Sequence, residues 1–222
     1  MVLANTKGIV FRFVKYGDTS IIVTIFTSQF GLQAYIVNGV RSKSGKGKIA
    51  LYQPLTPLEM VVYHKETTTI MRIKEAKCIY PYQHLSADVR KTTIALFIEE
   101  VINKSIKEEA HASELCDFLI DSLITLDKIE KPENFHLIFM VLLSRHLGFQ
   151  PQTASEVLGG RVMDFDEERL LEAILNAEYS NDIVMTNEQR RSVLDALLRF
   201  YSMHVDNFGQ MKSLSVLREI LS

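Results

Sequence analysis

The residues best suited to chemistry in this sequence are the cations of one glycine-bearing stretch, residues 39–54, which reads GVRSKSGKGKIALYQP. Glycine, lysine and serine are concentrated here as in a phosphate-binding loop, but five residues separate Gly39 from Gly45, and Lys46 is followed by Gly47. A Walker A loop requires four residues between its glycines and a serine or threonine after its lysine. The spacing therefore argues against nucleotide hydrolysis and favours a cationic arm that contacts phosphates without sequence preference.

Cations on the flanking segments extend this arm into a candidate nucleic-acid surface. The predicted phosphate contacts are Lys7, Arg12, Lys15, Arg41, Lys43, Lys46 and Lys48. Tyr35 and Tyr52, and also Tyr16, lie close to these charges in the sequence, where they could stack on unpaired bases. The alternative is that the lysines solvate a surface loop and the tyrosines complete a core.

The remaining polar residues form no catalytic or metal-binding pattern. The densest acidic cluster, residues 164–168, is not an EF-hand, because Arg169 stands where glycine is required and Leu175 where the last acid is required. Carboxylates at the start of a helix explain the cluster. The only two cysteines, Cys78 and Cys116, exclude a cysteine-based zinc ribbon. The sequence predicts no enzyme, no cofactor and no metal site.

Charge is distributed unevenly along the chain. Residues 1–80 hold eleven Lys or Arg against four acids, which gives +7, and the total of −2 leaves −9 for the remainder. A basic segment joined to an acidic one indicates that only the first faces a polyanion. No apolar stretch is long enough to span a membrane and no export signal begins the chain, so we expect a cytoplasmic protein.

The elements that must position these residues are five strands followed by helices. β-Branched and aromatic residues recur with period two in GIVFRFV, SIIVTIFT, LQAYIVN, LTPLEMVVYH and TTTIMRIKEA. Five short strands in about 70 residues, with a long third connection, suit a five-stranded OB-type barrel, although an SH3-like barrel would read similarly. After Pro81 the period changes to 3.6. We therefore predict an α+β, two-domain protein, with an OB-type domain at residues 1–80 and an all-α domain at residues 81–222.

One predicted helix, residues 135–147, is apolar over an unusually broad surface. Burial on two sides explains this pattern most simply, and a groove for a partner peptide is the alternative. The candidate partner-binding residues are Phe135, Phe139, Leu142 and Arg145.

Several stretches, in order along the chain, resemble the bacterial RecO family. They are YGDTSIIVTIFTSQFG (16–31), NGVRSKSGK (38–46), QPLTPLEM (53–60), LLSRHLGFQP (142–151) and KSLSVLREIL (212–221). Two departures stand out. Many family members carry a four-cysteine zinc module where QTASEVLGGRVMD (152–164) has no cysteine, and Asn38 stands where a lysine is expected. The zinc module is therefore expected to be absent.

This resemblance implies an OB fold followed by a helical domain, and a role in DNA repair, recombination and the response to DNA damage. It implies binding of single- and double-stranded DNA, annealing of complementary strands in association with the nucleoid, and work with RecR, sometimes with RecF, to load RecA onto strands coated by single-stranded DNA-binding protein. The helical domain would dock the acidic C-terminal tail of that protein. The rival hypotheses are a protein-interaction adaptor that does not bind DNA and, third, a nuclease, for which the basic segment has too few clustered acids.

Overall fold

A computed structural model describes residues 2–42, 48–65, 67–107, 112–162 and 164–221. Within these residues the chain folds into two compact units, of which the first comprises residues 1–82 and 107–124 and the second residues 83–106 and 125–222. The β-strands of the first unit end close to the predicted boundary at residue 80. The first unit also includes the later helical residues 107–124, which the predicted boundary assigned to the second domain. No helix among the described residues combines the length and the hydropathy that crossing a membrane requires.

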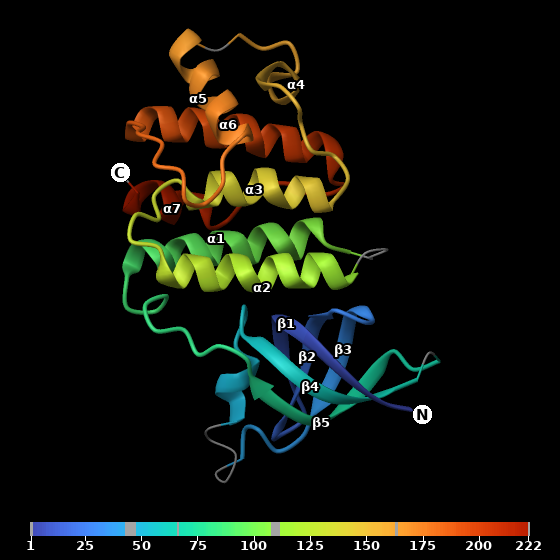
Figure 1. Ribbon diagram of the computed structural model, residues 1–222. Helices are drawn as coiled ribbons and strands as arrows, with labels where there is room; N and C mark the ends of the chain where they lie inside the picture. The colour runs from blue at the N-terminus through green and yellow to red at the C-terminus, as the bar shows by residue number, and fades with distance from the viewer. Residues whose placement is uncertain (1, 43–47, 66, 108–111, 163, 222) are drawn as a thin grey trace. The chain divides into compact units, whose positions relative to one another are not determined.

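The first unit is built on a closed five-stranded barrel (Figure 1). Its strands are β1 (Val2–Tyr16), β2 (Ser20–Thr27), β3 (Gly31–Val37), β4 (Pro57–His64) and β5 (Ile70–Cys78). Their order is β1-β2-β3-β5-β4, with β3 and β5 parallel and the other pairs antiparallel. This order confirms the predicted OB-type barrel.

The long first strand closes the barrel. Its first half pairs with β4, from Val2 opposite His64 to Ile9 opposite Pro57, and its second half pairs with β2. The strand begins earlier than the alternation in the sequence indicates, because pairing with β4 holds its more polar N-terminal residues in the sheet. A bulge between Val10 and Arg12 marks the change of partner.

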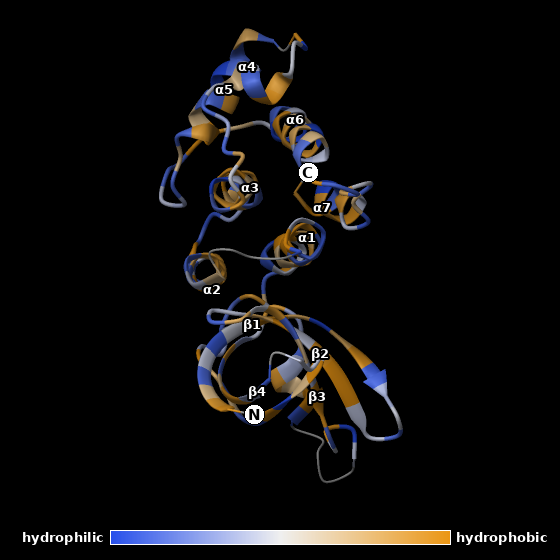
Figure 2. Ribbon diagram, turned by 90° about the vertical axis from the view of Figure 1, so that its right-hand side faces the viewer, coloured by the Kyte–Doolittle hydropathy of each residue, from blue (hydrophilic) through white to orange (hydrophobic). Residues whose placement is uncertain are grey.

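The barrel interior is filled by alternate residues of all five strands, as the period-two pattern requires. Figure 2 shows the barrel as a ring with hydrophobic and hydrophilic residues interspersed along it. The interior side chains include Val10, Ile21, Val23, Ile25, Tyr35, Leu58, Met60, Val62 and Met71, each at most 4% exposed. Their alternation fixes which residues point outward, and these outward residues form the surface of the barrel.

The helical part begins with α1 (Val89–Ser105) and α2 (Ala112–Lys128), followed by α3 (Phe135–His146), α4 (Ala154–Leu158), α5 (Phe165–Leu175), α6 (Asn187–His204) and α7 (Leu214–Ile220). In the second unit, α3 contacts α1, α5 and α6, and α1 contacts α7. Thr186 and Gln189 form a capping box at the start of α6. Ser213 occupies the N-cap position of α7, but its hydroxyl donates to Glu100 and does not cap its own helix.

A buried carboxylate fixes the segment that leads into α1. Asp127, in the last turn of α2, is fully buried and accepts hydrogen bonds from the backbone N–H groups of Gln83, His84 and Leu85, at 3.0, 2.7 and 2.7 Å. The buried Lys91 ammonium donates to the Asp127 carbonyl oxygen at 2.7 Å. These bonds satisfy polar groups that would otherwise be buried without partners.

Candidate nucleic-acid interface

One face of the barrel carries arginines at the edges and apolar side chains between them. The strand register places outward-facing residues in two rows across β1, β2, β3 and β5, and neighbours in each row are paired residues of adjacent strands. The first row is Arg12, Thr24, Ala34 and Ile70, and the second is Val14, Ile22, Ile36 and Arg72. We call these eight residues the arginine face.

The edges of the arginine face are accessible, and its only charged residues are the two arginines. Arg12 and Arg72 are exposed, as are Val14 (56%) and Ile70 (41%). None of its eight residues is acidic, so nothing on it repels a phosphate. The outer surface around strands 2 and 3 is where OB barrels bind oligonucleotides. The sequence prediction included Arg12 but missed Arg72 and the apolar residues, since only the pairing of β3 with β5 brings Arg72 into the row.

The turn between β1 and β2 lies at one end of this face, and Arg41 fastens the chain after β3 to it. The Arg41 backbone N–H donates to the Thr19 carbonyl at 3.0 Å, and its guanidinium donates to the Gly17 carbonyl at 3.1 Å. Gly17 has φ of +53°, a left-handed conformation that glycine tolerates best. The contacts hold the base of the basic loop beside Lys15 and Tyr16, which are both exposed.

The predicted cations are only partly brought together. Arg12, Lys15 and Lys48 are exposed, and Arg41 is half-buried at the turn. Lys43 and Lys46 lie outside the described residues. Lys7 forms an ion pair with Asp117 of α2, and this hydrogen bond raises the pKa of the lysine. The pairing makes Lys7 a weaker candidate for phosphate contact than the sequence indicates.

The structure corrects the base-stacking role predicted for Tyr35 and Tyr52. Tyr35 is fully buried in the barrel interior and Tyr52 is 5% exposed, at the end of the 3-10 helix η2 (Lys48–Tyr52). Burial raises the pKa of both phenols. Both rings complete the core, which is the alternative that the sequence left open. Tyr16, at 53% exposed, is placed for stacking.

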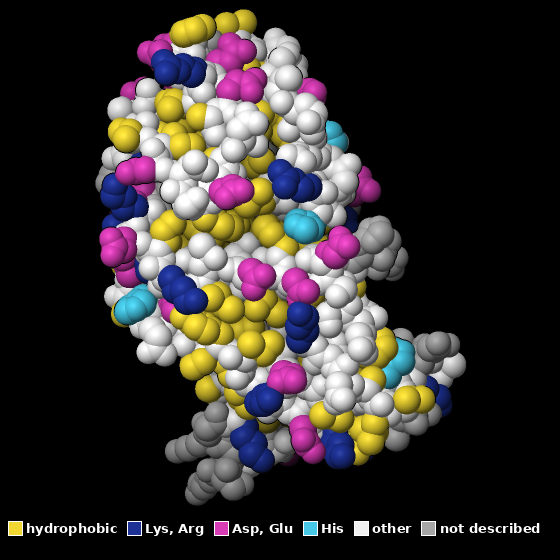
Figure 3. All heavy atoms as spheres, in the orientation of Figure 1, with side chains coloured by type: hydrophobic (Ala, Val, Ile, Leu, Met, Phe, Trp, Pro, Cys, Tyr) yellow, Lys and Arg dark blue, Asp and Glu magenta, His cyan; other side chains and the backbone are white. Residues whose placement is uncertain are grey.

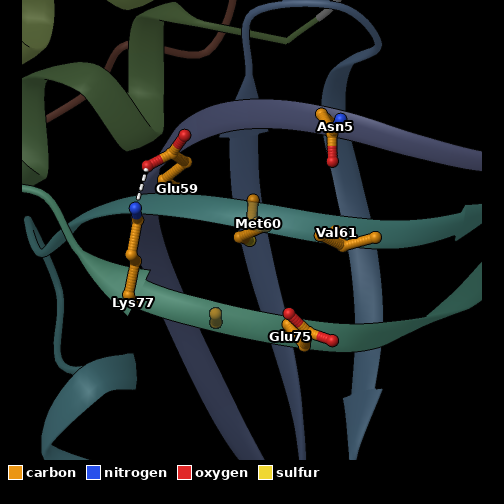
Figure 4. Close-up of a pocket in the computed structure, with 7 residues that line it drawn as sticks. Asn5, Glu59, Met60, Val61, Glu75 and Lys77 are labelled. Carbon is orange, nitrogen blue, oxygen red and sulfur yellow. Dashed lines mark ion pairs between the residues drawn. The ribbon is translucent and has the colours of Figure 1, made fainter.

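The outer surface of β1, β4 and β5 is chemically different (Figure 4). A shallow groove of about 410 Å³ there is lined by Asn5, Glu59, Met60, Val61, Glu75, Ala76 and Lys77. The Lys77 ammonium pairs with the Glu59 carboxylate at 2.8 Å, and Glu75 adds a second negative charge. Basic and acidic side chains are interspersed over the face of the barrel that Figure 3 shows. The Glu59 groove is therefore poorly suited to a phosphate backbone.

Comparison with known proteins identifies the family. Residues 1–82 match the model described as Recombination protein O N terminal, and residues 86–164 match the model described as Recombination protein O C terminal. The chain belongs to the RecO family. A protein of Flavobacterium psychrophilum named DNA repair protein RecO is 35% identical over 235 aligned positions, covering 98% of this chain and 99% of the relative. Proteins of the same name from Christiangramia forsetii and Phocaeicola vulgatus are 34% and 31% identical, over 98% and 99% of this chain and 99% and 100% of the relative.

The segment in which many RecO proteins carry a zinc module is held here by helix packing. Ala154, Val157 and Leu158 of α4 are buried, and the Glu172 carboxylate accepts from the Ala154 backbone N–H at 2.6 Å. Residues 152–164 include no cysteine, and no cluster of three metal-ligating side chains occurs in the described part of the chain. The side chains present here do not fit a zinc site.

The structure also shows what the second departure from the RecO pattern, Asn38, does. Asn38 is exposed after β3, and its Oδ1 accepts a hydrogen bond from the Ser20 hydroxyl at 3.0 Å. This bond ties the chain after β3 to the start of β2, beside the turn that Arg41 fastens. Asn38 therefore supports the turn where a lysine would contribute charge.

The partner-binding helix predicted for this RecO chain is mostly core. Phe135 is 2% exposed and Phe139 is fully buried, because α3 packs on α1, α5 and α6. The structure thus corrects the predicted roles of Phe135 and Phe139 as an open docking face. Leu142 is half-buried, and Arg145 is exposed and donates to the Gln150 side-chain carbonyl at 3.0 Å.

A groove of about 470 Å³ lies beside the N-terminal end of α3, and the sequence did not predict it. Its apolar lining includes Phe135, which stacks on Tyr179 with ring centroids 4.1 Å apart. Its polar lining includes the guanidinium of Arg190, which is 9% exposed and donates to the Asn134 and Asn187 side-chain carbonyls. Burial lowers the pKa of Arg190. We call this the Phe135 groove.

Proposed function

We propose that this RecO-family protein binds single- and double-stranded DNA through the arginine face and the adjoining turn, and that it anneals complementary strands without catalysing a covalent step. The observation that carries the proposal is the arginine face itself, with an arginine and an exposed apolar residue on each edge strand, half-buried residues between them and no carboxylate. Its position on the OB barrel supports the same reading.

Each group in this face has a physical task. The guanidiniums of Arg12 and Arg72, with Lys15 and Lys48, contact phosphates and release counterions, so binding depends on salt and ignores sequence. Tyr16 and Val14 offer a stacking surface to unpaired bases. Neutralising the phosphates lowers the repulsion between two strands, and this favours their annealing.

The wider role follows from family membership. We propose that the protein acts as a mediator with RecR, and in some settings RecF, to load RecA onto strands coated by single-stranded DNA-binding protein. The Phe135 groove offers an aromatic floor, but its lining holds Glu130, Glu133 and Asp182 beside Lys131 and Arg190, so its charge does not favour the acidic C-terminal tail of that coating protein. Arg145 and Leu142 remain candidates for a contact with that tail.

The test of DNA binding compares two residues of one strand. Arg72 and Lys77 are both exposed on β5, but Arg72 belongs to the arginine face and Lys77 to the Glu59 groove. Arg72→Glu should weaken oligonucleotide binding and reduce the slope of log affinity against log salt by about one per lost phosphate contact. Lys77→Glu makes the same charge change and should leave the slope unchanged.

Wild type and the two variants also distinguish an annealing function from an adaptor function. If the protein is an adaptor that does not use DNA, wild type and both variants bind an unpaired oligonucleotide equally poorly in dilute buffer. Under the proposal, wild type accelerates annealing of complementary strands and Arg12→Glu/Arg72→Glu loses most of that acceleration. Equal loss with Lys77→Glu would show that total charge matters and the arginine face does not.

A further inference from the structure

Two exposed apolar side chains stand out in the second unit. Val162 is 99% exposed, and Phe165, the first residue of α5, is 78% exposed. Asp164, Asp166 and Glu168 are exposed around them. We call these five residues the Phe165 segment. Large apolar side chains grouped on a surface commonly mark an interaction site.

The local structure holds this segment outward. The Asp164 side chain caps α5 by accepting from the Asp166 backbone N–H at 3.0 Å, so the helix begins with Phe165 facing solvent. Glu167 points elsewhere and accepts from the Ser192 hydroxyl at 3.0 Å. No ion pair within the described residues involves Asp164, Asp166 or Glu168. Arg161 and Arg169 flank the segment, which itself carries only negative charge.

The arginine face is the complement of this segment. It offers exposed apolar groups, Val14 and Ile70, where the segment offers Val162 and Phe165. It has cations at its edges where the segment has carboxylates. A single DNA strand also presents alternating apolar bases and anionic phosphates, so a surface suited to one is suited to the other.

We propose that the Phe165 segment of one copy docks on the arginine face of a second copy, with carboxylates in the place of phosphates and Phe165 in the place of a base. Such a contact joins two different surfaces, so it continues from copy to copy unless a ring closes. Protein that is not bound to DNA then self-associates, and DNA displaces the Phe165 segment from the arginine face. The displacement rests on the proposed function, whereas the docking does not.

The test uses two variants of the full-length chain, each changed only at exposed positions. Val162→Ser/Phe165→Ser removes the two apolar side chains of the Phe165 segment, and Arg12→Glu/Arg72→Glu reverses the charges of the arginine face. Sedimentation velocity without DNA should show wild type associating as concentration rises and separating as salt rises. Each variant alone should stay a single copy.

The decisive sample is an equal mixture of the two variants. One variant keeps an intact arginine face and the other keeps an intact segment, so the mixture should form two-copy complexes that do not grow further. A wild-type protein that remains single at every concentration, or a Val162→Ser/Phe165→Ser protein that associates like wild type, would overturn the docking. A mixture that stays single would do the same.

DNA is added only in a second step, which keeps the two proposals apart. An unpaired oligonucleotide should convert associated wild-type protein into DNA-bound single copies. If association follows the pattern above but the oligonucleotide neither binds nor disperses it, the docking holds and the DNA-binding proposal fails. If the oligonucleotide binds without dispersing the copies, DNA uses a surface other than the arginine face, and both the proposed DNA site and the displacement are rejected while the docking stands.

Discussion

Tyr16, Tyr35 and Tyr52 lie near the same cations in the sequence, but only Tyr16 is placed to touch a ligand. The register separates them, because Tyr35 pairs with the interior residue Val23 whereas Tyr16 pairs with Ser20 beside the turn of the hairpin. A period-two pattern shows that neighbours point to opposite sides, and the assignment of sides follows from the whole barrel. The sequence alone therefore left the roles of these tyrosines open.

Replacing Tyr16 tests the stacking role. Tyr16→Ala should weaken binding of an unpaired oligonucleotide by about 1–3 kcal/mol, the usual value of one base–aromatic stack. Duplex binding should change less, because paired bases are already stacked. Tyr35→Phe is the matched control, since it removes only a buried hydroxyl that has no hydrogen-bond partner within the described structure. It should leave DNA binding intact, and fluorescence titration measures both variants.

His136 should make stability depend on pH. It is buried, its ring meets Phe97 edge-on, and desolvation together with the nearby Arg190 lowers its pKa from 6.5 to about 3. Between these values the unfolded chain binds a proton that the folded chain does not. The free energy of unfolding is therefore fully present above about pH 6.5 and falls as pH decreases, by at most about 1.4 kcal/mol per pH unit from this group.

Urea denaturation of wild type and His136→Leu at pH 7 and pH 5 measures this contribution. The stability difference between the two proteins should move in favour of the variant at pH 5. His84→Gln, at an exposed position, is the control and should track wild type. A His136→Leu protein with the same pH dependence as wild type would rule out the proposed role of this histidine.

Among the elements, the positions of the strands in the sequence were the most predictable, and the pairing of the strands in the sheet was the least. Alternation of residues such as Ile21, Val23 and Ile25 indicates a strand with one buried side. It does not show that β3 pairs with β5 across 30 intervening residues or more, and that pairing creates the arginine face. The broad apolar helix α3 was similarly ambiguous, because burial on several sides and an open groove leave the same sequence pattern.

Asp127 tests how an element is held in place. Asp127→Asn keeps the size of the side chain but turns an amino group toward backbone N–H donors, so the hydrogen bonds to residues 83–85 cannot all form. We expect a loss of about 3 kcal/mol in the free energy of unfolding. Glu114→Gln, at an exposed position in the first turn of the same helix, should cost less than about 1 kcal/mol. Equal costs at both positions would contradict the role of Asp127.

For the whole molecule, charge is the property that the sequence predicted most usefully. The excess of cations in residues 1–80 predicts which part contacts a polyanion, and the proposed DNA site lies in that part. The total did not show that Lys7 and Lys77 are paired with carboxylates or that Arg12 and Arg72 share a carboxylate-free face. Pairing within the fold thus decides which cations remain available for the proposed contact with DNA.

The most direct test of this account is photo-crosslinking of the wild-type protein to an unpaired oligonucleotide that carries 5-iodouracil, followed by mass spectrometry of the crosslinked peptides. Crosslinks should fall on Tyr16 and on peptides of β1, β2, β3 and the Arg72 end of β5. Crosslinks confined to β4 around Glu59, or to the helices of the second unit, would contradict the arginine face as the DNA-binding surface.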